Sequence, residues 1–358
     1  MESLSSIIVD PVRNVAGMLD PLMQMTQSSL DEMQLGLLKQ LVQLLSLYVL
    51  ANPKAVSACI LLNESLRMPV KTLMKLFAMP AGTTNIQWIP KTEFYVLVKD
   101  MLDVVCLIAL YCDDDTGDAL RTLLPSETIS SLLSHDIPDD TFLSLVTVCA
   151  VFTKLEVFVE DLERTKIQTS SNTSVQQVSC LEHLCSAMTI HRATPKATYT
   201  IHQRIFDFFF IALEASPKNL RILERSLHLT SIVLYADKLT DRFIYASKMR
   251  SHLAPPAGLF NNGRNLCARL RRMTLDSSDR HKQLGLDECD DVKHLSMELH
   301  RAIQFIYRII CSGHTGFRSA RVYYHMLVSV MIKILSEPQL GEFAGRLIRD
   351  YVMMLMVY

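Results

Sequence analysis

The sequence predicts an all-α protein, and three observations support this prediction. A capping side chain directly precedes four of the prolines, and each such pair predicts a helix start. The pairs are Asp10-Pro11, Asp20-Pro21, Asn52-Pro53 and Ser216-Pro217. The cap oxygen accepts an N–H that has no partner inside the helix, and proline at the first helical position has no N–H to leave unpaired. Apolar residues recur at three- and four-residue spacing, while the two-residue alternation of half-buried strands is nearly absent. Glycine, at 11 of 358 residues, has less than half its usual share of about 7%, which disfavours nucleotide-binding sheets and barrels.

The first half of the chain predicts a series of helices separated by short connections. Ser29-x-x-Glu32 is a capping box, so we expect a long helix to begin there and to end at Asn52-Pro53. A loop is expected over Ala81–Lys91, where the only tryptophan, Trp88, lies. Further helices are predicted over 53–66, 70–79, 92–111, 118–124, 126–135 and, as one long helix capped by Asp139 or Asp140, 139–164.

The second half resumes the helical pattern after a polar stretch. Pro255-Pro256-Ala257-Gly258 and the segment 274–290 are expected to be loops. Helices are predicted over 178–191, 197–214, 217–238, 241–253, 264–273, 291–312, 317–337 and 339–358, which brings the predicted total to about fourteen.

The polar stretch 165–177, TKIQTSSNTSVQQ, is rich in serine and threonine and coincides with a change in charge sign. Residues 1–190 hold 12 Lys/Arg and 22 Asp/Glu, a balance of −10, whereas residues 191–358 hold 24 and 15, a balance of +9. We therefore predict three parts: an acidic helical-repeat segment (1–164), a polar linker or long loop (165–177) and a basic helical-repeat segment (178–358). Such a division favours two separate partners or contact between copies, and chance segregation of solvated helix faces is the alternative.

Helices of 12–22 residues joined by short loops fit either a compact bundle or stacked helical hairpins that form an α-solenoid. The number of helices favours stacking, because a single core stops growing usefully at this size. Leucine-rich runs such as Leu37–Leu45 resemble the armadillo/HEAT class of helical-repeat proteins, although no strict 40-residue period is present. The chain is also similar to the large armadillo-type proteins of vertebrate meiosis, in the class of the meiosis inhibitor protein. That similarity rests on no diagnostic motif, and it implies a nuclear or chromosome-associated, meiotic complex.

Composition and cysteine usage predict a nuclear or cytoplasmic protein. Hydrophobic residues make up 49% and charged residues 20% of the chain, which excludes a disordered chain. The nine cysteines are scattered singly and lie mostly in apolar runs, as expected of reduced, buried thiols. The longest uncharged apolar stretches fall short of the roughly 18–20 residues that span a bilayer, so no membrane contact is expected.

Candidate chemical motifs fail on spacing. Cys180-x-x-His183-x-Cys185 has zinc-binding residue types, but these positions subtend too wide an arc of a helix to meet at one ion. The acidic run from Asp113 has glycine at its fifth instead of its sixth position, so it lacks the spacing of a calcium loop. Gly313-His314-Thr315-Gly316 matches a nucleic-acid clamp whose strands are missing here, and a helix cap is the better interpretation. We therefore expect no catalytic residue, metal, cofactor or small-molecule substrate.

One surface feature predicts a binding site. Residues 241–282 hold nine Lys/Arg against three acids. Arginine forks match phosphate and carboxylate geometry, so this basic patch is a candidate contact for an acidic peptide segment or for nucleic acid. The alternative is a solvated basic helix that pairs with the acids between 287 and 291. The residues predicted to bind a partner are Arg264, Arg269, Arg271, Arg272, Arg280 and Lys282.

Taken together, these patterns predict a non-enzymatic helical-repeat scaffold that binds protein partners through a groove or an exposed face. Direct binding of DNA or RNA phosphates by the basic half is the alternative function. An enzyme whose site leaves no sequence motif is a third hypothesis.

Overall fold

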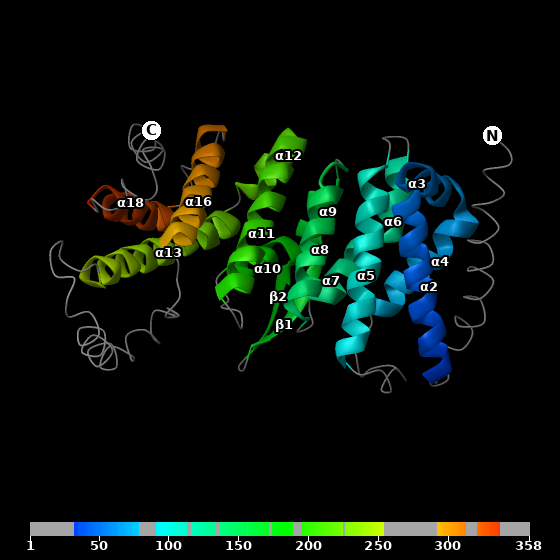
Figure 1. Cartoon of the computed structure of the whole chain (residues 1–358). Helices are drawn as coiled ribbons and strands as arrows, with labels where there is room; N and C mark the ends of the chain where they lie inside the picture. The colour runs from blue at the N-terminus through cyan, green and yellow to red at the C-terminus, as the bar shows by residue number, and fades with distance from the viewer. Residues whose placement is uncertain are drawn as a thin grey trace, which may run out of the picture. The chain divides into compact units, whose positions relative to one another are not determined.

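The computed structural model describes ten stretches of the chain, and every structural statement below refers to them. They are residues 32–78, 91–112, 116–133, 137–155, 157–171, 174–188, 195–224, 226–253, 292–312 and 321–336. Within them the chain is mostly helical, which confirms the all-α class (Figure 1). The solenoid arrangement stays a prediction.

The described chain divides into two compact units, which are treated separately. Unit 1 comprises residues 1–183 and 207–219, and unit 2 comprises residues 184–206 and 220–358. Helices α10 (Cys180–Ala187), α11 (Pro195–Ala215) and α12 (Pro217–Leu223) contribute residues to both units.

Unit 1 is a set of helices packed around α5 (Lys91–Leu110), which contacts α2, α3, α4 and α8. Residues on one face of α5, such as Val98, Met101 and Val105, are fully buried. The remaining helices of this unit are α2 (Glu32–Ala51), α3 (Pro53–Leu62), α4 (Glu64–Ala78), α6 (Gly117–Leu123), α7 (Ser126–Leu133), α8 (Asp139–Phe152) and α9 (Phe158–Arg164).

Unit 2 is organised by α13 (Ser226–Leu253), which packs against α16 (Val292–Ser312) and α18 (Arg321–Ser336) (Figure 1). Its core is rich in aromatic rings. Phe206 of α11 lies 6.0 Å from the ring of Tyr235 and 6.3 Å from that of Phe305, centroid to centroid.

Two of the predicted cap-proline starts lie in the described chain, and both are confirmed. The side chain of Asn52 accepts a hydrogen bond from the Ala55 N–H, and Pro53 is the first residue of α3. Ser216 accepts one from the Lys218 N–H at 3.2 Å, directly before α12. The starts at Pro11 and Pro21, the Trp88 loop and the helices predicted over 264–273 and 339–358 lie outside the described residues.

The single long helix predicted over 139–164 is wrong, because the chain breaks between α8 and α9. At Thr153 both the backbone N–H and the side-chain hydroxyl bond the carbonyl of Ala150, at 3.4 and 2.7 Å. The Thr153 N–H thus reaches a carbonyl three residues back instead of four, which is the tighter geometry of a helix end. The break predicted between 66 and 70 is also misplaced, since α3 ends at Leu62 and α4 runs on from Glu64 to Ala78.

In unit 2 the break falls elsewhere than predicted. The two helices expected over 217–238 and 241–253 are instead α12, which ends at Leu223, and α13, which runs without interruption from Ser226 to Leu253. Thr240, where a break was expected, is buried, and its hydroxyl bonds the carbonyl of Ala236 within α13.

Residues 166–171 and 174–179 pair as the two antiparallel strands of a β-hairpin, where a polar linker or long loop was predicted. Strand β1 (Lys166–Ser171) pairs with β2 (Ser174–Ser179), with Ile167 opposite Val178. The hairpin lies within unit 1, where β1 contacts α7 and Ser130 donates to the carbonyl of Lys166 at 3.0 Å. The strands were not predicted because they consist largely of threonine, serine and glutamine and lack the alternation of apolar and polar residues on which strand prediction relies. The predicted domain boundary at 165–177 stays a prediction.

Candidate functional site: an exposed leucine face on α2

The six residues of the basic patch that were predicted to bind a partner lie outside the described residues, whereas Arg242, at the start of the same basic stretch, is described and buried in α13. These six residues fall between 254 and 291, so their role in binding stays a prediction. Within the described chain, three features of other kinds were not predicted: an exposed apolar face on α2, a polar contact between α5 and α8, and a buried polar cluster in unit 2.

The first of these features is the leucine face, defined by Leu44, Leu47 and Leu50 of α2. Their exposed fractions are 38%, 64% and 58%. Val42 and Val49, on the opposite side of the helix, are fully buried against the rest of unit 1. The three leucines follow one another at three-residue intervals, so they spread over about 120° of the helix surface within fewer than two turns of α2.

The composition of α2 explains why this face is apolar. From residue 40 to residue 51 the helix contains no charged side chain. A surface helix ordinarily places charged residues opposite its buried stripe. On α2 that side holds the leucines together with the uncharged, exposed Gln40 and Gln43. Contiguous exposed apolar surface marks an interaction site in soluble proteins. The leucine face is therefore a candidate docking surface, which the described packing leaves open.

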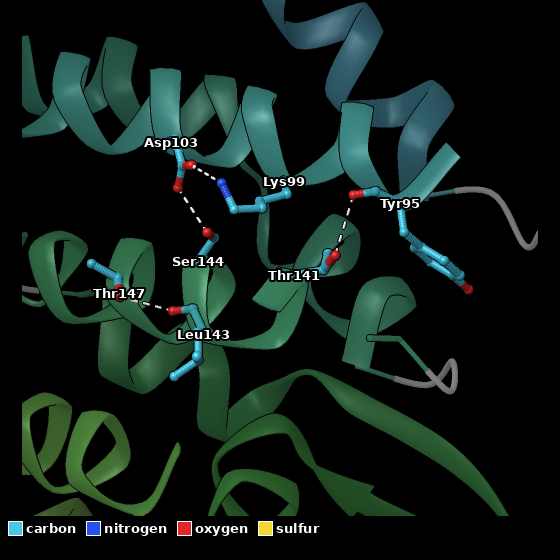
Figure 2. Close-up of polar contacts among 7 residues, drawn as sticks. All are labelled: Tyr95, Lys99, Asp103, Thr141, Leu143, Ser144 and Thr147. Atoms are coloured by element: carbon cyan, nitrogen blue, oxygen red, sulfur yellow. Dashed lines mark hydrogen bonds and ion pairs between the residues drawn. The ribbon is translucent and has the colours of Figure 1, made fainter. Parts of the chain in front are cut away.

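The second feature joins α5 to α8 through side chains that Figure 2 shows facing one another. Asp103 of α5 accepts from Ser144 of α8 at 2.7 Å and from Lys99, one turn earlier, at 2.8 Å. Thr141 donates to the backbone carbonyl of Tyr95 at 3.2 Å, while the ring of Tyr95 points away from the contact. These bonds fix the alignment of the two helices along their length.

Near this contact the single ammonium group of Lys99 faces three carboxylates, those of Asp103, Asp100 and Asp140. The hydrogen bond to Asp103 raises the pKa of Lys99, and the carboxylates of Asp103, Asp100 and Asp140 add to the shift against a partial opposition from burial. Burial raises the pKa of Asp100, with the ammonium of Lys99 opposing and Asp103 reinforcing that change. The side chains of Lys99 and Asp103 are 38% and 48% exposed, so solvent screens the pair and it contributes little to stability.

The third feature is a buried polar cluster in unit 2, formed by His202, Tyr235 and Glu298 from α11, α13 and α16. All three are at most 5% exposed. The hydroxyl of Tyr235 donates to Oε2 of Glu298 and lies 2.6 Å from Nδ1 of His202, which itself is 3.3 Å from the same carboxylate oxygen.

The proton arrangement in this cluster follows from counting donors. Tyrosine has one hydroxyl proton and gives it to Glu298, so the proton between His202 and Tyr235 resides on Nδ1 of the imidazole. The other ring nitrogen, Nε2, is buried and has no hydrogen-bond partner among the described residues. This cluster therefore links three helices by a chain of hydrogen bonds in which each proton has a defined direction.

Cysteines 149 and 180 show what burial does to thiol chemistry in unit 1. Burial raises the pKa of Cys180 to about 12 and raises that of Cys149 as well. A thiol held protonated in this way is a poor nucleophile at neutral pH. Among the described residues no three His, Cys, Asp or Glu side chains are placed to hold a metal ion.

No single described helix is both long enough and apolar enough to cross a bilayer. The segments Val42–Ala51 and Pro53–Leu62 pass the length and composition criteria only together, and they are bent by 119° at their junction.

Comparisons with models of known families, with characterised proteins and with solved structures find no match for this chain. The armadillo/HEAT resemblance and the meiotic class therefore stay predictions.

Sequence signals for the unpredicted features were of unequal strength. The leucine face could have been found, because residues 40–51 lack any charge. Glu298 was a weaker signal, as an acid in the core-facing stripe of Leu295, Leu299 and Ala302. Its partners lie 96 and 63 residues away in sequence, and no local pattern identifies them.

Proposed function

We propose that this chain is a non-enzymatic helical scaffold that binds protein partners and that the leucine face of α2 is the centre of its docking surface. The observation that carries the proposal is the exposure of Leu47 and Leu50, at 64% and 58%, on a helix without charge from residue 40 to residue 51. A few large apolar side chains at the middle of an interface commonly supply most of the binding energy.

The expected partner element is an amphipathic helix. Leucines at three-residue spacing form a ridge that a second helix can accept between its own i, i+3 and i+4 side chains. An uncharged face offers no ion pair to a charged peptide, so apolar contact is the main attraction. The resemblance to armadillo/HEAT proteins supports a scaffold role, and the resemblance to meiotic proteins suggests a nuclear, chromosome-associated complex as its setting.

The test is affinity purification of the full chain from cells, with quantitative mass spectrometry of the proteins that co-purify. Leu47→Glu and Leu50→Glu place a charge at the centre of the face, and we expect them to remove the partners that dock there. Both side chains are already largely in solvent, so the fold should persist, and circular dichroism checks this.

A matched control is Ile332→Glu on α18, since Ile332 has a similar exposed fraction of 56%. The control should keep the partners that the α2 variants lose. An unchanged partner list for the α2 variants would overturn the proposal. Arg269→Glu, Arg271→Glu and Arg272→Glu, tested in parallel, ask whether the alternative basic patch carries the binding instead.

A further inference from the structure

We infer that the leucine face of α2 selects partner helices that carry acidic side chains beside their apolar stripe. This inference rests on the proposed function, because it names the chemistry of the partner that docks on the same surface. The charges of α2, α3 and α4, all within the described residues 32–78, carry the inference.

Helices α2, α3 and α4 are together basic, although they belong to the acidic half of the chain. Residues 32–78 hold five Lys/Arg and two Asp/Glu, a balance of +3, whereas residues 1–190 as a whole have a balance of −10. Helix α3 packs against both α2 and α4 (Figure 1). The charge close to the leucine face therefore favours an acidic ligand, opposite to what the average charge of this half would favour.

Lys54 places a positive charge at the end of the leucine face. It follows Leu50 by four residues, so its Cα lies no more than about 14 Å from that of Leu50. The side chain of Lys54 is exposed, and it makes no ion pair with any residue that the structure describes. The lysine that precedes the face, Lys39, is paired with Glu93 of α5. Lys54 is thus the lysine that remains available to a carboxylate of a partner.

Helix α4 adds a row of basic side chains to the same part of unit 1. Arg67, Lys71 and Lys75 follow one another at four-residue intervals, so they lie on one side of the helix. The guanidinium of Arg67 donates to the carbonyl of Leu61 at 2.8 Å, which ties the start of α4 to the end of α3. At low ionic strength, where the Debye length reaches about 30 Å, these charges attract an acidic ligand before it makes contact.

The leucines and the charges have different roles in this recognition. The face itself has no charge from residue 40 to residue 51, so its leucines supply the affinity by apolar contact. Charges at the rim of an interface set the association rate and discriminate between partners. An exposed ion pair changes an affinity by about fivefold or less, so the selection is a preference and not an absolute requirement.

Binding of two synthetic peptides to the purified full-length chain tests the inference. Both peptides have about 18 residues, enough for a helix, and carry leucines at the i, i+3, i+4 and i+7 positions of one side. The positions beside the leucines are glutamate in one peptide and lysine in the other, and fluorescence anisotropy of an attached dye gives the dissociation constants. We expect the glutamate peptide to bind about tenfold more tightly at low salt, with a smaller difference at physiological salt. Equal affinities, or tighter binding of the lysine peptide, would overturn the inference.

A charge reversal at Lys54 sharpens the test. Lys54→Glu should weaken binding of the glutamate peptide about fivefold and strengthen binding of the lysine peptide, because the charge at the end of the face changes sign. Lys166→Glu is the matched control, since Lys166 is also exposed, lies on β1 and gives the same change in net charge. The control should leave both affinities within about twofold of the parent. Equal effects of the two substitutions would contradict selection by the charge at the leucine face.

Two uncharged substitutions separate this inference from the proposed function. Leu47→Ala and Leu50→Ala remove apolar surface without changing charge, so both should weaken the two peptides by the same factor. Binding that depends on Leu47 without a preference for glutamate would refute the acidic selection and keep the docking face. Binding that is indifferent to both leucines, or no binding of either peptide, would overturn the inference, whereas the proposed function is decided by the partners that Leu47→Glu removes in cells.

Discussion

The α5–α8 contact of unit 1 and the α11–α13–α16 contact of unit 2 place their ionisable side chains in opposite ways. In unit 1 the centre of the interface is apolar, with Met101 and Leu145 fully buried, and the polar pair of Lys99 and Asp103 is about half exposed. In unit 2 the polar groups are inside: Tyr235 and Glu298 are at most 5% exposed and are enclosed by aromatic rings such as Phe206.

The difference teaches that the burial of a polar side chain, more than the number of its hydrogen bonds, sets how much those bonds contribute to the free energy of unfolding. A hydrogen bond at a half-exposed margin is exchanged for a bond to water when it breaks, so its net contribution is small. A buried carboxylate that loses a donor keeps its full desolvation cost. Unit 2 should therefore depend on single hydroxyl groups, whereas unit 1 should depend on the volume of its apolar side chains.

The largest effect is expected from Leu145→Ala in α8. Leu145 is fully buried, and removing its side chain should lower the free energy of unfolding by about 2–5 kcal/mol because a cavity remains. Amide hydrogen exchange of α8 measures the change within unit 1. Leu143→Ala, on a partly exposed face of the same helix, is the control and should cost clearly less. If both variants exchange alike, the apolar centre of this contact is not what stabilises unit 1.

Tyr235→Phe in unit 2 should follow, with a loss of about 1.5–3 kcal/mol, because the hydroxyl that bonds the Glu298 carboxylate is gone. Exchange of α13 and α16 amides reports the change. Tyr111→Phe removes a hydroxyl from a tyrosine that is 45% exposed, and it should have no measurable effect. A cost for Tyr235→Phe no greater than that for Ser144→Ala would break the comparison between the two units.

Ser144→Ala should cost less, about 0.5–1.5 kcal/mol and near the lower end of that range. The substitution removes the donor to Asp103. This carboxylate keeps its bond to Lys99 and is 48% exposed, so a water molecule can replace the serine hydroxyl. Urea unfolding followed by circular dichroism measures the difference. A loss as large as that of Leu145→Ala would show that the polar margin, and not the apolar centre, holds α5 to α8.

Asp100→Asn should give the smallest effect and the only one that depends on pH. Burial raises the pKa of Asp100 in the folded protein above its ordinary value of 3.8. The folded state thus favours the protonated form, and this contribution is present below pH 3.8 and is lost as pH rises through the folded pKa. At neutral pH the amide should stabilise unit 1 by less than about 1 kcal/mol, and the gain should vanish near pH 3. A variant less stable than the parent at neutral pH would show that attraction to Lys99 outweighs burial.

Helix content was predictable from local chemistry alone. The caps at Asn52 and Ser216 form as expected, since a cap and the following proline involve only neighbouring residues. The places where the chain breaks were less predictable. At the end of α8 the backbone N–H of Thr153 bonds the carbonyl three residues earlier instead of four, whereas α13 continues through the buried Thr240 although its hydroxyl also bonds the preceding turn.

The hairpin shows that a polar stretch of sequence does not always form a loop. Six residue pairs join β1 and β2, although their side chains are largely serine, threonine and glutamine. The strands are supported by Ile167, which is buried at 1% exposure, and by the Ser130 hydroxyl on α7. Since α7 lies 36 residues earlier in the chain, that support is invisible to a local pattern.

By itself, the sequence determined that the described chain is helical and that α2 has no charged side from residue 40 onward, because both properties follow from the order of neighbouring residues. Only the tertiary structure decided which side of α2 stays open and which acid, imidazole and hydroxyl meet inside unit 2. Those outcomes depend on packing between helices far apart in the sequence, where burial changes the cost of every polar group and local spacing carries no record of it.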